Sequence, residues 1–351
     1  MSEIVILGAG VMGSAMAFPA TANGHSVTLV GTHLDRDIID SVAADGRHPR
    51  LGVTMPAGVV ALHHDRFAAA LSDRTALVIL GVSSPGVDWA IEKLGQDLSR
   101  PIPVLMITKG LSTHGNSIEV LPTKVARGLF ERLGRAVPVM AVGGPCIAGE
   151  LAARRPSSVV FTGERDTPLL ETVRLLATDF YFARPAFDLV GVEVAVALKN
   201  LFVIGVSSVA GRLEREGKAE NGAVMHNLAA SLFAQAVGEI AYLVQALGGD
   251  PVSAYGLPGV GDLYVTSQAG RTTMLGRYLG MGLPYRQARE QHLTGVTIEA
   301  ADLAFAVGPT LRAMTKDGRL DPARIPLALA IIDAVISDKP FTTDWQAFHR
   351  A

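Results

Sequence analysis

The sequence has few of the features that mark secreted, membrane-bound or nucleic-acid-binding proteins. It contains one cysteine, Cys146, among 351 residues, so an intrachain disulfide is excluded and a reducing compartment is expected. The net charge is −2, without a sizeable run of one sign, which argues against general binding to nucleic acid or anionic membranes. The N-terminus enters a strand pattern without the basic segment and cleavage site of a signal peptide. We therefore expect a soluble, cytoplasmic protein without nucleic-acid partners or stable membrane insertion.

Apolar residues are abundant, at 49% of the chain against 18% charged residues, and they suit a large core in two domains. The most apolar stretch, 191–211, has Lys199 as its only charge between Glu193 and Arg212. A buried ammonium is costly without a partner, and buried lysines are suited to proton transfer. The alternative is that Lys199 extends to solvent from the edge of a core helix. Asn200 lies seven residues after Glu193, so both would share one helix face as part of a buried polar cluster.

The first 30 residues read as a strand at 3–7, a glycine-rich turn, a helix and a second strand at 25–30. The turn, GAGVMG, matches the dinucleotide-binding motif G-x-G-x-x-G. Its first glycine allows the tight turn, its second lets the backbone approach a pyrophosphate, and its third lets the helix pack on the strand. A merely structural glycine turn is the weaker interpretation. The predicted cofactor contacts in the motif are Gly8, Gly10, Val11, Met12 and Gly13.

The end of the second strand bears on the type of nicotinamide cofactor. NAD enzymes usually place an acidic residue there to bind the ribose hydroxyls. Here Val30 is followed by Gly31 and Thr32, and Asp35 comes later with Arg36 beside it. The cofactor is therefore NAD or NADP, with NADP slightly favoured and Thr32 as a predicted contact. Asp35 has an alternative role as the N-cap of the following helix.

Strands and helices continue to alternate up to about residue 190, which predicts a doubly wound, Rossmann-type parallel sheet. Further strands are predicted at 76–82, 103–108, 137–142, 158–162 and 179–183. Ligands of such sheets bind beyond the carboxyl ends of the strands. Ser83, Lys109 and the segment 143–150 follow strand ends, so we expect them near the ligand.

After residue 190 the pattern is helical, without a convincing strand, and the segment 212–221 reads as an exposed loop or a helix extension. We therefore predict a dinucleotide-binding domain at 1–190 and an all-helical substrate and catalytic domain at 191–351. The predicted helices of the second domain are 191–210, 223–247, 252–257, 271–280, 285–291, 296–306 and 325–336.

Five motifs occur in an order and at distances that resemble the NAD(P)-dependent glycerol-3-phosphate dehydrogenases, from the N-terminus to about residue 300. They are GAGVMG, TKG at 108–110, GGPCIAGE at 143–150, GVEVAVALKN at 191–200 and GVGDLYVTS ending at Ser267. The GVE…LKN block followed by GxGDL…T is much more specific than the glycine motif. The resemblance implies a Rossmann domain followed by an all-helical domain, and a small phosphorylated substrate. Family members are often dimers, so a homodimer is an open expectation.

The resemblance also implies roles for individual residues. Lys199 matches the catalytic lysine, which would move a proton at the alcohol oxygen, and Asp262 would hold and tune it. Lys109 and Arg271 match cations that contact substrate and cofactor, Arg271 through the substrate phosphate. Taken alone, Asp262 also suits a helix N-cap, and the two cations suit an exposed surface. The remaining matches are Ala148 at the cofactor and Gly144, Cys146 and Thr266 at the substrate.

Two family motifs are altered in this chain. Where the family has S-R-N, the chain has Gly270-Arg271-Thr272, so Thr272 replaces an Asn that would contact the substrate. Where the family has V-x-E-G, the chain has Leu293-Thr294-Gly295 and no Glu. A site that hydrogen-bonds its substrate discriminates strongly when one partner is lost. A different phosphorylated polyol or a hydroxy acid therefore remains open as the substrate.

The sequence thus favours an oxidoreductase that interconverts sn-glycerol 3-phosphate and dihydroxyacetone phosphate, or acts on a close phosphorylated polyol, without a metal. One alternative is a two-domain reductase of the ketopantoate or 3-hydroxy-acid type, which also pairs a Rossmann domain with a helical domain and a catalytic lysine. A second alternative is a non-catalytic dinucleotide sensor. The joint presence of Lys109, Lys199, Asp262 and Arg271 argues against the sensor.

Overall fold

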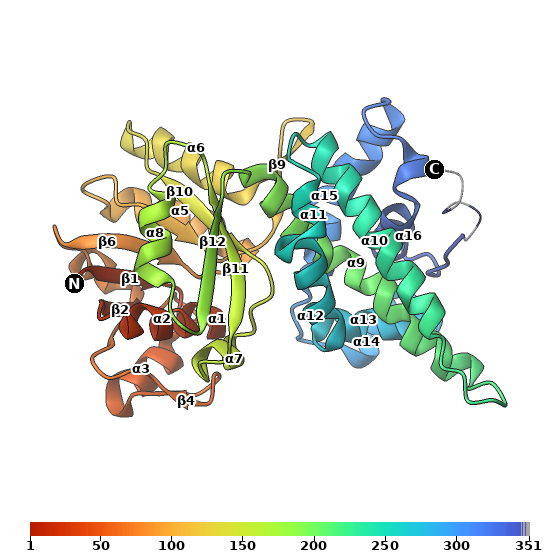
Figure 1. The fold of residues 1–351 in the computed structure, drawn as a ribbon, viewed down its shortest axis with the longest axis horizontal. Coiled ribbons are helices and arrows are strands. Elements are labelled where there is room, and N and C mark those ends of the chain that lie inside the picture. Colours follow the sequence, from red (N-terminus) through yellow and green to blue (C-terminus); the bar gives the residue numbers. More distant parts are fainter. Residues whose placement is uncertain (345, 347, 349–351) are drawn as a thin grey trace. The chain divides into compact units, whose positions relative to one another are not determined.

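The computed structural model describes residues 1–344, 346 and 348, and the chain forms two compact units. The first unit combines Met1–Lys109 with Leu121–Leu189, and contains the large sheet. The second combines Gly110–Val120 with the chain from Val190 onward, and is mainly helical (Figure 1).

The hairpin of β8 (Leu111–His114) and β9 (Ser117–Val120) belongs to the second unit, although a single boundary at residue 190 would leave it in the first. Both strands pack against α15 (Glu299–Lys316). The guanidinium of Arg319 also donates a hydrogen bond of 2.8 Å to the Asn116 carbonyl in the hairpin turn. These partners lie about 200 residues away in sequence, so no local pattern predicts them.

The first unit is built on an eight-stranded sheet with the order β12-β11-β10-β7-β6-β1-β2-β5. All five strands predicted after the first two are present, and β5 and the small β3–β4 pair add to them. The strands are β1 Glu3–Leu7, β2 Ser26–Val30, β5 Val60–Leu62, β6 Thr75–Leu80, β7 Val104–Met106, β10 Val139–Gly143, β11 Ser157–Gly163 and β12 Tyr181–Ala186, with β3 at Arg47–His48 and β4 at Val53–Thr54. The order places β1 centrally, so the loop after it opens between β6 and β2.

One pairing departs from the predicted parallel sheet, because β10 and β11 are antiparallel. The other pairs in this sheet are parallel. The connection from β10 to β11 contains only α7, the five residues Ala148–Ala152. Five helical residues rise about 7.5 Å, whereas a five-residue strand spans about 16 Å. The helix is too short to return the chain along the sheet, so the next strand runs back instead.

Helices of the first unit pack on the sheet through small and branched apolar side chains. They are α1 Val11–Ala15, α2 Ala17–Ala22, α3 Arg36–Asp45, α4 Phe67–Ala70, α5 Val87–Asp97, α6 Leu121–Leu133, α7 and α8 Leu169–Leu176, with single turns at His64–Arg66 and Ser84–Gly86. The core includes Ile4, Ile6 and Leu29 of the strands, and Ile38 of α3, all fully or almost fully buried.

The second unit contains the seven predicted helices, although α9 and α15 are longer than expected and α12 was not expected. They are α9 Leu189–Glu216, α10 His226–Ala246, α11 Val252–Tyr255, α12 Asp262–Gln268, α13 Arg271–Gly280, α14 Tyr285–His292, α15 and α16 Pro326–Ile336, with short turns at Leu257–Gly261 and Pro322–Arg324. Helix α9 extends through the start of the segment 212–221, and the rest of that segment is an exposed loop, so both expectations for it are confirmed.

Helix α9 runs through the second unit, and small residues let its neighbours approach its backbone. A Cβ at Gly280 of α13 would overlap the carbonyl of Ser208, and one at Gly211 would overlap the carbonyl of Arg277. Helices α9 and α10 are long and apolar enough to cross a membrane, but the most apolar stretch of α9 is 89% buried inside the structure. That burial is what a core helix shows, as its sequence predicted.

Candidate active site

The loop between β1 and α1 has the shape that its three glycines predict. Gly8 has a φ of +112°, and a Cβ there would lie 2.6 Å from the carbonyl carbon of Gly81. A Cβ at Gly13 would overlap the carbonyl oxygen of Gly8. By contrast, a Cβ at Gly10 would meet no atom within 4 Å, so this glycine keeps an open surface clear. An open glycine backbone at a helix N-terminus is what a pyrophosphate requires, and the loop therefore fits a dinucleotide.

Ala9, between the first two glycines, is held at both ends of its backbone. Its N–H donates to Oδ2 of Asp35 at 3.2 Å, and its carbonyl accepts from Nε2 of the fully buried His48 at 3.0 Å. Nδ1 of His48 accepts from the N–H of Leu51 at 3.0 Å, which assigns the proton to Nε2. Both polar groups of Ala9 thus point into the unit, and the following backbone N–H groups are left to face a ligand.

Asp35 occupies the N-cap position of α3, as the alternative predicted, but its side chain makes no capping hydrogen bond to that helix. Its Oδ2 instead accepts from the Ala9 N–H and, at 2.8 Å each, from the backbone N–H and the hydroxyl of Thr32. The carboxylate is almost completely buried. Thr32, a predicted cofactor contact, therefore lies beside the glycine loop. The Asp35 carboxylate connects the backbone of Thr32 to that of Ala9.

The ends of β7 and β10 bring two other predicted residues together. Nζ of Lys109 donates to the carbonyl of Gly144 at 3.2 Å, across neighbouring strands. The loop after β6 supports this strand end. There the hydroxyl of Ser84 donates to the Lys109 carbonyl at 2.9 Å, and the hydroxyl of Thr108 donates to the carbonyl of Val82 at 2.6 Å. Ser83, also predicted, immediately precedes the turn that Ser84 begins.

The remaining predicted residues of the first unit lie at helix starts. Val11 is exposed at the first position of α1, and Ala148 is the first residue of α7. Met12, Cys146 and Ala148 are partly buried and pack against the hydrophobic core of the sheet. Cys146 forms no disulfide and has intermediate exposure.

In the second unit, Lys199 forms a buried polar cluster with Asp262 and Thr266. Its Nζ lies 3.0 Å from Oδ1 of Asp262 and donates to the Thr266 hydroxyl at 2.6 Å. That hydroxyl donates in turn to Oδ1 of Asp262 at 3.3 Å. The side chains of Lys199 and Asp262 are only 6% and 3% exposed. The alternative in which Lys199 extends to solvent is therefore wrong.

The local fold explains how three residues from two helices meet. Asp262 begins α12 directly after the turn Leu257–Gly261, and Thr266 follows four residues later on the same helix face. A Cβ at Gly259 would overlap the backbone of Ala254, so the turn before α12 is closely packed. A buried ammonium without a counter-charge is strongly disfavoured, and Asp262 provides that charge at hydrogen-bond distance. The cluster therefore holds a charged lysine in a desolvated place.

Arg271 lies at the start of α13 and belongs to a second, more exposed set. Its guanidinium lies 3.8 Å from Oε1 of Glu299, and these side chains are 54% and 56% exposed. Oε2 of Glu299 accepts from the side-chain amide of Asn200 at 3.3 Å. Asn200 is buried beside Lys199 in sequence, as the predicted polar cluster required. Glu193, the other predicted member, is fully buried on α9.

The two altered motifs take different positions. Thr272 is buried in the first turn of α13, where its side chain is 7% exposed. Thr294 is exposed, and its hydroxyl donates to the carbonyl of Glu290 at the end of α14. Thr294 therefore caps the C-terminal end of α14 through its hydroxyl group.

Sequence reasoning did not find His48, Thr108 or Glu299. His48 and Thr108 act through backbone groups 39 and 26 residues away, and such bonds leave no periodic signal. Glu299 lies 99 residues from Asn200. Its only local signal is an acidic residue in the first turn of a helix, which favours helix capping.

Models of one protein family cover both units. Residues 3–167 match the NAD-dependent glycerol-3-phosphate dehydrogenase N-terminus, and residues 188–342 match the C-terminus of the same family. An NADP(+)-dependent glycerol-3-phosphate dehydrogenase of Archaeoglobus fulgidus is 33% identical over 318 residues, which cover 89% of this chain and 92% of the relative. A glycerol-3-phosphate dehydrogenase [NAD(P)+] of Geobacillus kaustophilus is 29% identical over 352 residues, or 97% and 92% of the two chains.

Solved structures share the fold. A glycerol-3-phosphate dehydrogenase of Coxiella burnetii superposes with a TM-score of 0.77 at 23% identity, covering 99% of this chain and 98% of the other. A ketopantoate reductase of Ralstonia eutropha gives only 0.53 at 17% identity, covering 95% and 98%. The family models over both units and the relative of Archaeoglobus fulgidus do not favour the reductase alternative. The glycine loop, the lysine cluster and the matches over both units establish that the chain belongs to the NAD-dependent glycerol-3-phosphate dehydrogenase family.

Proposed function

We propose that this protein is an NAD(P)-dependent oxidoreductase that interconverts sn-glycerol 3-phosphate and dihydroxyacetone phosphate. The observation that carries the proposal is the buried cluster of Lys199, Asp262 and Thr266, in a chain whose two units both match this family. When bound, the nicotinamide cofactor gives or accepts the hydride at the substrate carbon. The protein has to manage the proton at the substrate oxygen.

Lys199 is the group proposed to move that proton. In the reducing direction its ammonium donates a proton to the oxygen of the former carbonyl, and in the oxidising direction the amine accepts one from the alcohol. Asp262, 3.0 Å from Nζ, stabilises the ammonium and fixes its position. Thr266 accepts a hydrogen bond from the same ammonium, so the nitrogen is aimed before the substrate arrives.

The substrate phosphate is assigned to Arg271, whose exposed guanidinium can form two hydrogen bonds with a phosphate. Removing it by Arg271→Ala is expected to raise KM about tenfold or more for the phosphorylated substrate. The dephosphorylated analogue, dihydroxyacetone, should lose far less. Equal effects on both substrates would remove Arg271 from phosphate recognition. Lys109, Gly144, Cys146 and Thr272 are the other proposed substrate contacts.

The cofactor is assigned to the loop Gly8–Gly13, because Gly10 leaves an open surface at the start of α1. Val11, Met12, Thr32, Ser83, Lys109, Ala148 and Arg271 are further proposed contacts. NADP is slightly favoured for two reasons. Oδ2 of Asp35 already accepts hydrogen bonds from Ala9 and Thr32, and β2 does not end in an acidic residue that could bind the ribose hydroxyls. Arg36 beside it is exposed.

The cellular setting follows from composition. A cytoplasmic location is proposed because Cys146 is the single cysteine of the chain and forms no disulfide. A homodimer is the proposed assembly by likeness to the family. Light scattering coupled to size-exclusion chromatography would measure the mass against the 36.9 kDa chain.

The first test is oxidation of NADH and of NADPH, in separate assays, with dihydroxyacetone phosphate as substrate. Rapid turnover is expected with at least one cofactor, and comparison of the two kcat/KM values identifies the preferred one. Tight binding of reduced cofactor without turnover on dihydroxyacetone phosphate would contradict the proposed substrate. Other phosphorylated ketoses, followed by ketopantoate, would then be tested.

A further inference from the structure

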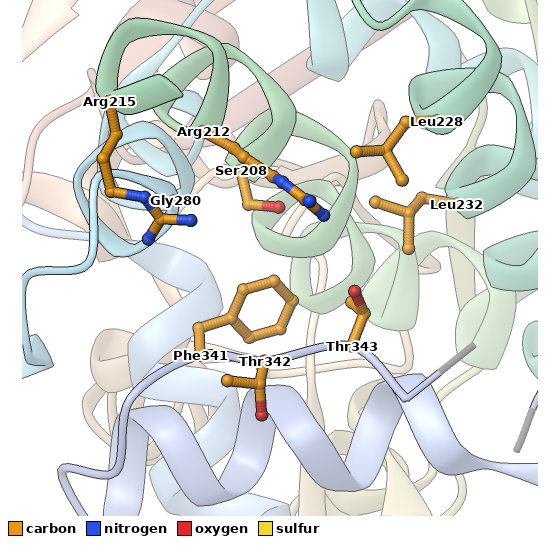
Figure 2. Close-up of a pocket in the computed structure, with 9 residues that line it drawn as sticks. All are labelled: Ser208, Arg212, Arg215, Leu228, Leu232, Gly280, Phe341, Thr342 and Thr343. Atoms are coloured by element: carbon orange, nitrogen blue, oxygen red, sulfur yellow. The ribbon is translucent and has the colours of Figure 1, made fainter. Parts of the chain in front are cut away.

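A cavity of about 240 Å³ lies in the second unit, at the end of α9 remote from Lys199. Its walls come from α9, the first half of α10, the end of α13 and the C-terminal segment (Figure 2). The lining residues are Ser208, Arg212, Arg215, Leu228, Leu232, Gly280, Phe341, Thr342 and Thr343. Its volume equals the liquid volume of about eight water molecules, which suits a compact organic molecule.

The polar side of the cavity is cationic. Arg212 and Arg215, three residues apart, project from the last turns of α9, and none of the lining residues is acidic. Both guanidinium groups bond to one carboxylate oxygen, Oε1 of Glu216, at 2.9 Å and 3.2 Å. The neighbouring Glu214 is engaged by Arg277 at 2.5 Å and 2.8 Å. Two cations therefore share a single carboxylate at the rim, which leaves a net positive charge.

Three apolar side chains and three hydroxyl-bearing residues complete the lining. Leu228 and Leu232 lie on one face of α10, and Phe341 adds an aromatic ring from the C-terminal segment, which Figure 2 shows beneath Ser208 and Arg212. Figure 2 shows the Arg212 guanidinium extending over the space beside the leucines, with the Thr343 hydroxyl directed toward it and Thr342 turned away. The arrangement combines charge and hydrogen-bonding groups with an apolar wall of Leu228, Leu232 and Phe341 around one space, as small-molecule sites do.

The cavity is separate from the lysine cluster. Arg212 follows Lys199 by 13 residues on the same helix, which is about 20 Å at 1.5 Å per residue. Its floor is rigid, because Gly280 allows α13 to contact the Ser208 backbone directly. A ligand here would meet a preformed surface and would not touch the proposed catalytic residues.

We propose that this cavity binds an organic phosphate monoester with a compact apolar body. A phosphate monoester carries about −1.5 to −2 charges at pH 7 and three acceptor oxygens, which two guanidinium groups and the Thr343 hydroxyl can satisfy. Its apolar body would cover Leu228, Leu232 and Phe341. Glu216 competes with the ligand for the same guanidinium groups, so it sets the affinity.

The test is calorimetric titration of the full chain with phenyl phosphate, with inorganic phosphate as comparator. Phenyl phosphate is expected to bind at least tenfold more tightly than inorganic phosphate, because only the ester covers the apolar wall. Arg212→Met should weaken phenyl phosphate binding tenfold or more, and Glu216→Gln should strengthen it several-fold. Thermal melting checks that each variant is folded.

Two controls locate the binding. Arg286→Met removes another exposed arginine of the same unit, which pairs with Asp338 outside the cavity, and should leave the affinity unchanged. Arg271→Met should also leave it unchanged, because that arginine belongs to the proposed substrate site. Equal affinity for parent and Arg212→Met, loss of binding in Arg271→Met, or no binding at millimolar ligand would each overturn the proposal.

A different observation supports a second inference, which rests on the proposed function. We infer that Asp35 and His48 are positioning residues for the cofactor, because they hold the N–H and the carbonyl of Ala9 at 3.2 Å and 3.0 Å. Without this brace the Ala9 peptide could rotate, and the N–H groups that follow would lose their common direction. The brace lies inside the unit, so neither residue has to touch the cofactor.

Binding of NADPH, followed by its fluorescence, tests the brace independently of turnover. Asp35→Ala and His48→Ala are expected to raise the cofactor Kd about tenfold, with kcat at saturating cofactor changed by less than about threefold. Asp35→Asn should be milder, because an amide oxygen can still accept the same bonds. Asp37→Asn, on the same helix but exposed and paired with Arg50, is the control. An unchanged Kd in both alanine variants would refute the inference, whatever the substrate proves to be.

Discussion

The glycine loop of the first unit and the lysine cluster of the second show two ways of preparing a site. The loop works through backbone, with Gly10 left open and Ala9 fixed from behind by Asp35 and His48. The cluster works through side chains, with a charged lysine buried against Asp262 and Thr266. A backbone site tolerates little change in shape, whereas a buried ion pair tolerates little change in charge. Substitutions that change shape should therefore affect the glycine loop most, and substitutions that change charge should affect the lysine cluster most.

Replacing the buried cation should have the largest effect. Lys199→Met keeps a long, unbranched side chain but removes the proton donor, and it is expected to lower kcat by about 10²-fold or more. The cofactor Kd should stay within about threefold, because the loop belongs to the other unit. Steady-state kinetics and NADPH titration measure both values. Unchanged turnover would remove Lys199 from the mechanism.

A second buried ionisable side chain in the helical unit tests whether such a residue can have a purely structural role there. Glu239 of α10 accepts bonds of 2.8 Å from the N–H groups of Leu327 and Ala328 at the start of α16. Burial raises its pKa to about 7, although the Gln235 amide and the two N–H groups act in the opposite direction.

Because the pKa in the folded protein lies above the ordinary value of 4.5, this carboxyl contributes stability that is complete below pH 4.5 and is lost as pH rises through about 7. The loss amounts to about 3 kcal/mol. Glu239→Gln cannot ionise, so its free energy of unfolding should lack this pH-dependent decline, while kcat changes little. Urea denaturation of both proteins between pH 4.5 and 8 measures the difference. Parallel stability curves would contradict the assigned titration.

Two glycine-to-alanine substitutions can distinguish the glycines that the fold of the loop requires from those that cofactor binding requires. Gly13→Ala places a Cβ against the Gly8 carbonyl and should destabilise the protein by about 1–3 kcal/mol. Gly10→Ala meets no atom within 4 Å, so the melting temperature should remain near that of the parent. Cofactor binding should nevertheless weaken about tenfold, because the methyl group occupies the open surface. Normal cofactor affinity in Gly10→Ala would show that the pyrophosphate does not approach this residue.

The smallest effect is expected at Glu299, which partly neutralises Arg271. Both side chains are more than half exposed, so solvent screens the pair at 3.8 Å. Glu299→Gln should lower KM for the phosphorylated substrate about two- to threefold at low salt, and the gain should shrink at 0.5 M salt. Glu290→Gln, an exposed acid on α14, is a matched control. A higher KM in Glu299→Gln would instead indicate that this carboxylate binds the substrate.

Local pattern predicted those features that depend on neighbouring residues. The strand, glycine turn and helix at 3–15 follow from a β-branched run, the conformational freedom of Gly8 and the space that Gly10 leaves. The apolar surroundings of Lys199 on α9 left burial and extension to solvent both open, and the structure decided for burial. The roles of Asp262 and Thr266 came from family resemblance, and α12, which presents them, was not expected.

The reversal of β11, the placement of the β8–β9 hairpin and the contacts of His48 and Glu299 could not be read from local pattern. Each depends on where a distant segment packs: the length available for a crossover, a helix nearly 200 residues away, or a backbone carbonyl across the unit. Such contacts carry no periodicity, because a single hydrogen bond constrains one residue on each side. Composition and local pattern therefore determined the elements and the cofactor loop, and long-range packing determined which side chains meet.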